Sequence, residues 1–222
     1  MEPDTTLFSI PRKGIINVQT SDLPSKLPAV FDLDAAPAEG DDDVPQKDSW
    51  SSLILIMIYE FLRGEQSFWK PYFDVLPENF DTPMFWSDAD LSELQASAAR
   101  AKVGKTEAED MFRANILPVI RQNPGLFVSS QEKADDDLIN LAHRMGSTIM
   151  AYAFDLENED DRDDDDSDGW VEDRDGKSLM GMVPMADILN ADAEFNVSTL
   201  GNYLARMIIN ILRLMSTTAM TS

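Results

Sequence analysis

A largely apolar segment stands at residues 180–200 and reads MGMVPMADILNADAEFNVSTL. Its first half is apolar and contains one carboxylate, Asp187, which is followed three residues later by Asn190. Pro184 lacks a backbone N–H, so this half is expected to be a buried strand or turn and not a plain helix interior. A carboxylate in such surroundings needs hydrogen-bond donors, from its own turn or from a bound molecule. The residues alone favour the first alternative, a turn in which Asp187 and Asn190 cap their own backbone.

Composition restricts the class of protein. The chain has 222 residues, a net charge of −23 and a hydrophobic fraction of 43%, which is enough for a folded core. Such an acidic protein is not expected to bind nucleic acid, but it suits a basic protein partner. Because there is no cysteine, disulfides, thiolate zinc sites and thiol nucleophiles are excluded, and we expect no metal site. Neither a signal peptide nor an apolar run of membrane-spanning length is visible, which predicts an intracellular protein without a transmembrane segment.

Apolar periodicity predicts a mostly helical central region between short strands or turns near the N-terminus and the segment at residues 180–200. The strongest helix has a wide apolar face, which predicts burial on most of its sides. The expected helices cover residues 49–64, 88–98 (capped by Asp88), 106–121 (kinked at Pro118), 129–152 (beginning at Ser129 or Ser130) and 203–215.

Two groups of residues invite a chemical interpretation but are better explained by packing. Seven aromatic residues alternate with prolines at residues 67–86, where Lys70 is the single basic residue. A nucleic-acid platform would need more positive charge, so a compact packed turn is the better interpretation. His143 is the chain's one histidine, so it cannot build a metal site with others, and we interpret it as a structural residue of its helix.

Residues 155–175 form an acidic run with thirteen acidic residues and two arginines. Self-repulsion within this run predicts a disordered insertion. A near match to a calcium-binding EF-hand loop lies inside it, but glycines and a proline follow where the exit helix should be, so calcium binding is disfavoured. The residues of this match are Asp164, Asp166, Asp168, Gly169, Val171 and Asp175.

The sequence VPMADILNAD, at residues 183–192, resembles the core motif of SET-domain protein-lysine methyltransferases of the Rubisco-methyltransferase-like branch. It resembles in particular the fungal ribosomal lysine N-methyltransferase 4 type. Further segments agree with this family in the same order along the chain, which makes the resemblance specific. They lie at residues 7–23, 69–94, 118–127 and 143–157.

The resemblance implies an α+β fold: an incomplete SET domain dominated by its helical insert, with few short strands. The chain would then divide into five parts. These are residues 1–47, a partial N-terminal SET segment with an acidic loop; 48–154, the helical insert leading into the MAYAF motif; 155–175, the acidic insertion; 176–200, the SET core motif; and 201–222, an unmatched tail.

The resemblance also implies a reaction, the transfer of a methyl group from S-adenosyl-L-methionine to a lysine of a basic protein. A ribosomal or histone-like protein in the nucleus, and also in the cytoplasm, would be the substrate, and a complete enzyme would be a monomer. Many relatives have histidine where this chain has Ala191, so one ring contact to the cofactor would be missing. In family terms Asn190, Ala191, Tyr152 and Asp187 would form the cofactor site, with Asp187 ordering the turn, and Phe154 and Phe195 would wall the substrate channel.

Two parts that the family needs are not visible in this sequence. They are a glycine-containing loop before residue 7 and a Tyr-Gly segment after residue 196, so the catalytic tyrosine is not identifiable. We therefore expect the 222-residue chain to methylate poorly or not at all. The alternative function is a catalytically silent protein-interaction module, which would capture a basic partner without binding the cofactor.

Overall fold

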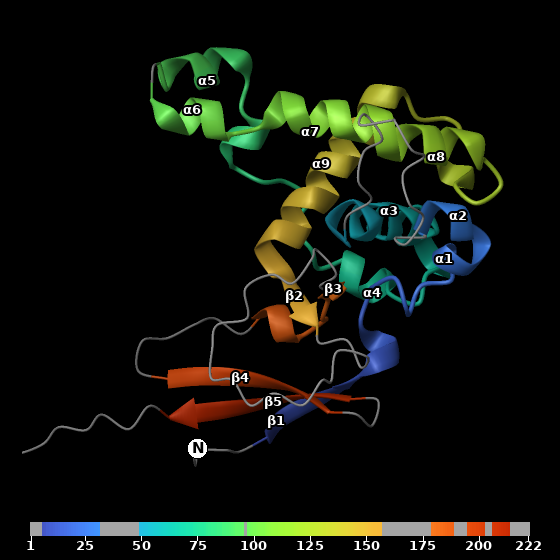
Figure 1. The fold of residues 1–222 in the computed structure, drawn as a ribbon, viewed down its shortest axis with the longest axis vertical. Coiled ribbons are helices and arrows are strands. Elements are labelled where there is room, and N and C mark those ends of the chain that lie inside the picture. The colour runs from blue at the N-terminus through green and yellow to red at the C-terminus, as the bar shows by residue number, and fades with distance from the viewer. Residues whose placement is uncertain are drawn as a thin grey trace, which may run out of the picture.

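The computed structural model describes residues 6–31, 49–95, 97–156, 179–188, 195–202 and 206–213. Within these ranges helices predominate and the strands are short, so the predicted α+β class is confirmed. Figure 1 shows the helices gathered in one part of the molecule and strands β1, β4 and β5 in another. Helix α9 runs from the first part toward the short strand β2.

Helix α3 (Ser49–Leu62) is the centre of the core, as predicted. Every residue from 52 to 60 is buried, because its run of Leu, Ile and Met residues is apolar on nearly all sides. Helix α9 (Asp135–Tyr152) packs along it. The close approach depends on Gly146 of α9, since a Cβ there would lie 3.1 Å from Cζ2 of Trp50.

Two helix starts differ from the prediction. Residues Val128–Ser130 form a separate 3-10 helix, η5, and α9 begins only at Asp135. Three consecutive aspartates occupy the first turn of α9, where the positive end of the helix dipole stabilises them. Helix α5 (Asp88–Glu93) is capped by Ser87 and not by Asp88, because the Ser87 Oγ accepts a hydrogen bond from the Asp90 N–H at 3.2 Å.

The helix predicted over residues 106–121 is broken next to Pro118. Helix α7 (Lys105–Met111) continues into a π-helical segment, η4 (Phe112–Ile116), and then into α8 (Leu117–Gln122). Proline has no N–H and crowds the carbonyl four residues before it, so a regular α-helix cannot run through this position. The remaining short helices are η1 (Arg12–Gly14), α1 (Leu23–Lys26), α2 (Pro28–Phe31), η2 (Gly64–Gln66), α4 (Lys70–Phe73), η3 (Pro83–Phe85), α6 (Ala98–Lys102) and η6 (Ala186–Ile188).

Within the described residues, the strands form two antiparallel sheets. In the first, β5 (Arg206–Arg213) lies between β1 (Thr6–Pro11) and β4 (Phe195–Asn202). In the second, β2 (Ala153–Leu156) pairs with β3 (Leu179–Met182).

The helix predicted at residues 203–215 is therefore wrong, since most of this stretch is strand β5. Its apolar residues do occur at helical spacing, but Ile208, Ile209 and Ile211 are β-branched and favour a strand. Pairing with β1 on one side and β4 on the other satisfies the backbone along β5, which overrides the local pattern.

The N-terminal segment joins the helices to the second sheet. Ile16 and Met182 exchange two backbone hydrogen bonds, of 2.9 and 3.0 Å. Gly181 lies against the same segment, where a Cβ would come within 3.3 Å of the Ile16 carbonyl oxygen and 2.7 Å of Leu156 Cδ1. On the helical side, the Trp69 indole N–H donates to the carbonyl oxygen of Gly14 at 2.9 Å. Residues 14–16 thus fix β3 relative to the helices.

His143 is buried in the helical core, with 5% of its surface exposed. Its ring meets the edge of Phe112 at a centroid distance of 5.0 Å, and its Nε2 lies 3.6 Å from a carboxylate oxygen of Glu109. Burial lowers the pKa of His143, Lys105 lowers it further, and the Glu109 carboxylate opposes this shift. These packing contacts agree with the structural role predicted for this residue.

We expect the protein to lose stability as the pH falls below about 6.5, the ordinary pKa of histidine. The unfolded chain takes up a proton on His143 at a higher pH than the folded chain does. This contribution is therefore complete above pH 6.5 and is lost toward the lowered pKa of the folded state, by at most about 1.4 kcal/mol per pH unit.

Melting temperatures measured between pH 7.5 and pH 5.5 check this expectation. The His143→Leu variant should show a flatter profile, because the chain has no other imidazole. Parallel profiles for the variant and the wild type would contradict the assignment of the effect to His143.

Candidate functional site

The candidate site is centred on Asp187, in the single turn of η6 that follows β3. Its Oδ2 accepts a hydrogen bond of 2.7 Å from the hydroxyl of Tyr72. Tyr72 lies 115 positions earlier in the chain, on α4, and is 8% exposed. Before η6, Met185 adopts a left-handed backbone conformation with φ of 75°, which turns the chain after Pro184. The carboxylate is thus bonded to a distant helix.

Helix α4 holds Tyr72 firmly. Pro71 stands in the first turn of this short helix, where its fixed φ favours helix initiation. Trp69, immediately before α4, is anchored by its bond to Gly14. Phe73 packs edge-on against Phe61 of α3, with ring centroids 5.9 Å apart. The position of the Tyr72 hydroxyl is therefore set by the central core.

The electrostatics of the site keep Tyr72 protonated. Burial raises the pKa of Tyr72 well above its usual value of 10, and the Asp187 carboxylate and the Tyr152 phenol raise it further. The hydroxyl is therefore a hydrogen-bond donor at every physiological pH. The second carboxylate oxygen, Oδ1 of Asp187, is buried without a hydrogen-bond partner among the residues that the structure describes. Such an oxygen is uncommon in a folded protein, and it offers an acceptor to a donor group of a bound molecule.

The structure brings several of the predicted site residues together. Tyr152 ends α9, is half-buried, and lies close enough to Tyr72 to affect its pKa. Phe154, in β2, is half-buried and packs against a small cluster that contains Val183 and Ala186, the latter directly before Asp187. Tyr152, Phe154 and Asp187 therefore belong to neighbouring parts of one region.

The other predicted residues are less well defined. Phe195 begins β4, and only its backbone is described, paired with Arg213 of β5. Asn190 and Ala191 lie outside the described residues. The same is true of residues 157–178, which include most of the predicted disordered insertion and the near match to an EF-hand loop.

Tyr72 was missed by the sequence analysis. It stands among the aromatic and proline residues that were interpreted as a packed turn, and this turn is indeed largely buried around Trp69, Tyr72 and Phe73. Nothing local in the sequence distinguishes its hydroxyl from the other aromatic groups. Only the fold brings it to Asp187.

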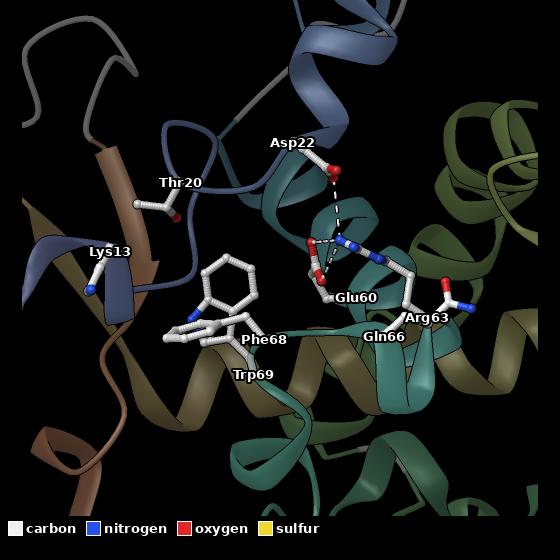
Figure 2. A pocket seen from close by; sticks show the side chains of 8 residues that line it. All are labelled: Lys13, Thr20, Asp22, Glu60, Arg63, Gln66, Phe68 and Trp69. Atoms are coloured by element: carbon white, nitrogen blue, oxygen red, sulfur yellow. Dashed lines mark hydrogen bonds and ion pairs between the residues drawn. The ribbon is translucent and has the colours of Figure 1, made fainter.

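A second feature is a hollow of about 280 Å³ beside α3. Figure 2 shows Phe68 and Trp69 across it from Arg63, with Glu60 and Asp22 around the guanidinium. Glu60 is fully buried and accepts hydrogen bonds from Ser21, Ser67 and Arg63, at 3.0, 2.8 and 3.2 Å. Arg63 pairs with both carboxylates, and Lys26 also pairs with Asp22, so these charges are satisfied within the protein. We therefore interpret this hollow as a structural feature that joins the N-terminal segment to α3. Its lining consists of Lys13, Thr20, Asp22, Glu60, Arg63, Gln66, Phe68 and Trp69.

The described part of the chain contains no cluster of three or more His, Cys, Asp or Glu side chains suited to a metal ion. Nor does any helix within it combine the length and the apolar character needed to cross a membrane.

Comparison with characterised proteins gives several relatives. The chain is 32% identical over 198 residues to ribosomal lysine N-methyltransferase 4 of Saccharomyces cerevisiae, a match that covers 86% of this chain and 37% of the yeast protein. It is 30% identical over 154 residues to the human N-lysine methyltransferase SETD6, covering 67% of this chain and 29% of the human protein. A shorter match, 48% over 48 residues, is to the chloroplastic Rubisco large subunit N-methyltransferase of Pisum sativum, covering 22% of this chain and 10% of the pea protein.

No protein-family model matches the chain. The chain spans about a third of the length of the yeast and human relatives, 37% and 29% respectively. The family resemblance inferred from the sequence motifs is nevertheless confirmed by these three relatives. Over most of its own length, this chain is a homologue of lysine N-methyltransferases of the SET and Rubisco-methyltransferase type.

Proposed function

We propose that the chain forms part of a SET-domain protein-lysine N-methyltransferase that uses S-adenosyl-L-methionine. The observation that carries this proposal is the Asp187 carboxylate beside Tyr152: Tyr72 holds one of its oxygens, and the other is buried with no partner among the described residues. In a homologue of lysine N-methyltransferases, this oxygen suits the amine or hydroxyl donors of the cofactor. The cofactor would supply an electrophilic methyl group to the lysine amine.

The proposed roles of the residues follow from their positions. Asp187 accepts a hydrogen bond from the bound molecule, and Tyr152 places a phenol beside it. Phe154 contributes an apolar wall that excludes water, which strengthens the polar contacts inside the site. Asn190, Ala191 and Phe195 complete the cofactor site and substrate channel in this proposal. The helices between residues 49 and 152 serve as the insert, and residues 179–188 form part of the core-motif segment at 176–200.

The proposed substrate is a basic protein of the ribosomal or histone-like kind, in the nucleus and also in the cytoplasm. The net charge of −23 favours encounter with such a partner. The yeast relative is named as a ribosomal lysine N-methyltransferase, which supports the choice of a ribosomal protein. The predicted low activity of the 222-residue chain stays a prediction.

We expect calorimetric titration with S-adenosyl-L-methionine to show saturable binding, and Asp187→Ala to weaken it at least about tenfold. A lost hydrogen bond to a charged group costs about 1.5–3 kcal/mol, which is a factor of ten or more in affinity. Asp74→Ala is the matched control, because Asp74 is exposed at the end of α4 and pairs with Lys70 at the surface. Absence of binding to the wild-type chain would refute the proposed function, and unchanged affinity in Asp187→Ala would refute the role of Asp187.

The alternative, a catalytically silent protein-interaction module, is supported by one observation. Met185 and Ile188, on either side of Asp187, are 56% and 67% exposed. Such apolar side chains beside a carboxylate suit contact with a basic protein segment. A silent module would give no heat with the cofactor but would still bind a basic ribosomal protein, so the same titration separates the two functions.

A further inference from the structure

We infer that Tyr72 is a positioning residue of the site, which holds the Asp187 carboxylate in the orientation that ligand binding requires. The inference rests on the proposed function. Through Tyr72, helix α4 directly affects Asp187, a residue of the core motif.

The turn that carries Asp187 is weakly held by its own contacts. Helix η6 has three residues, and a single turn of this kind has little stability of its own. Ala186 is buried, but Met185 and Ile188 on either side of the central residues are largely exposed. Met185 also occupies a left-handed conformation that non-glycine residues rarely adopt. This turn therefore depends on contacts from outside it: apolar packing holds Ala186, and a hydrogen bond holds Asp187.

Tyr72 supplies the polar contact, to Asp187, from a firmly packed helix. It is buried, its helix is fixed by the Trp69–Gly14 bond and by the Phe73–Phe61 packing, and its hydroxyl donates at 2.7 Å to Oδ2 of Asp187. With Oδ2 engaged, the plane of the carboxylate is set, and Oδ1 remains as a buried acceptor that no described residue pairs. The acceptor is thus in place before any ligand arrives.

Loss of the phenolic hydroxyl would leave the ring and its packing intact. The Asp187 side chain would then lack its donor and could rotate toward solvent, where water satisfies both oxygens. A ligand would have to pay the cost of ordering the carboxylate on binding, which lowers its affinity. The expected defect is in binding and not in folding.

The first experiment measures the dissociation constant of S-adenosyl-L-methionine by calorimetry for Tyr72→Phe in the full 222-residue chain. We expect the constant to rise about tenfold, corresponding to one hydrogen bond. The matched control is Tyr59→Phe, since Tyr59 is also buried and its hydroxyl accepts a hydrogen bond of 2.7 Å from Lys26, on α1. The control should stay within about twofold of the wild type, because the contacts of the Tyr59 hydroxyl, with Lys26 and Asp22, lie away from Asp187.

The same substitution in an Asp187→Ala background separates positioning from general packing. If Tyr72 acts through Asp187, removing its hydroxyl should change the constant by less than about twofold once the carboxylate is absent. An equal loss of affinity in both backgrounds would overturn the inference.

The second experiment does not depend on the cofactor. Hydrogen–deuterium exchange of the free chain should show faster exchange of the peptide at residues 182–188 in Tyr72→Phe, and no change there in Tyr59→Phe. If the wild-type chain does not bind the cofactor, the proposed function fails while this measurement still decides the role of Tyr72. Unchanged exchange at residues 182–188 in Tyr72→Phe would overturn the inference in either case.

Discussion

Replacing Glu60 by alanine is expected to lower the free energy of unfolding by about 3–5 kcal/mol, because two buried serine hydroxyls lose their acceptor, at about 1–3 kcal/mol each, and a cavity remains where the side chain was. Glu60 has no exposed surface, and its carboxylate accepts hydrogen bonds from Ser21, Ser67 and Arg63. Without it, both serine hydroxyls lose their acceptor inside the protein, and Arg63 retains Asp22 at 3.4 Å as its ionic partner. The contacts between the N-terminal segment, α3 and the turn before α4 would loosen together.

Urea denaturation followed by circular dichroism measures this effect. Glu65→Ala is the control, because Glu65 carries the same charge five residues later but is 91% exposed, with Lys70 3.7 Å away. An exposed pair of this kind contributes about 0–1 kcal/mol, so the control should unfold close to the wild type. A loss below about 1 kcal/mol in Glu60→Ala would show that the buried cluster stabilises the fold much less than its geometry indicates.

The second large effect is expected for Phe112→Ala, at about 3–5 kcal/mol, the range for a buried aromatic residue. Phe112 is 1% exposed and begins the π-helical segment η4. Its ring lies 6.2 Å from that of Trp50 and 5.0 Å from that of His143, so its removal opens a cavity between α3 and α9.

The same denaturation assay tests the prediction, with Phe68→Ala as the control. Phe68 has the same side chain but is 66% exposed, so truncating it removes little buried area. Equal losses in the two variants would mean that the core collapses around the missing Phe112 ring. A loss in Phe112→Ala well above that of the control is the expected outcome.

The helical core could be predicted because its signal is local. The apolar run of α3 indicates burial by itself, and Pro118 and the residues 123–125 mark a helix break and a helix end within a few positions. Glu60 also carried a usable signal, since a lone carboxylate in an apolar helix needs buried donors. The predicted start of α9, at Ser129 or Ser130, is too early. Three consecutive aspartates, at residues 135–137, form the first turn of the helix and mark its true start.

Features that depend on distant pairing could not be predicted in the same way. Strand β5 is recognisable only through β1, whose Ile10 pairs with Met207, and through β4. Within the candidate site, Asp187, Tyr152 and Phe154 were identified through a family resemblance, which carries information about the whole fold. The sequence around Tyr72 does not reveal its role, because its hydroxyl bonds to Asp187, which comes 115 residues later in the chain.

The separation of 115 residues between Tyr72 and Asp187 has a consequence for synthesis of the chain in the cell. At about 5–20 residues per second, Tyr72 emerges roughly 6–23 s before its acceptor. The contacts of α3, α4 and α9 can form during that interval, since all lie between residues 49 and 152. The nascent helical part therefore holds the Tyr72 hydroxyl without its final acceptor, and water can take the place of that acceptor until Asp187 has been synthesised.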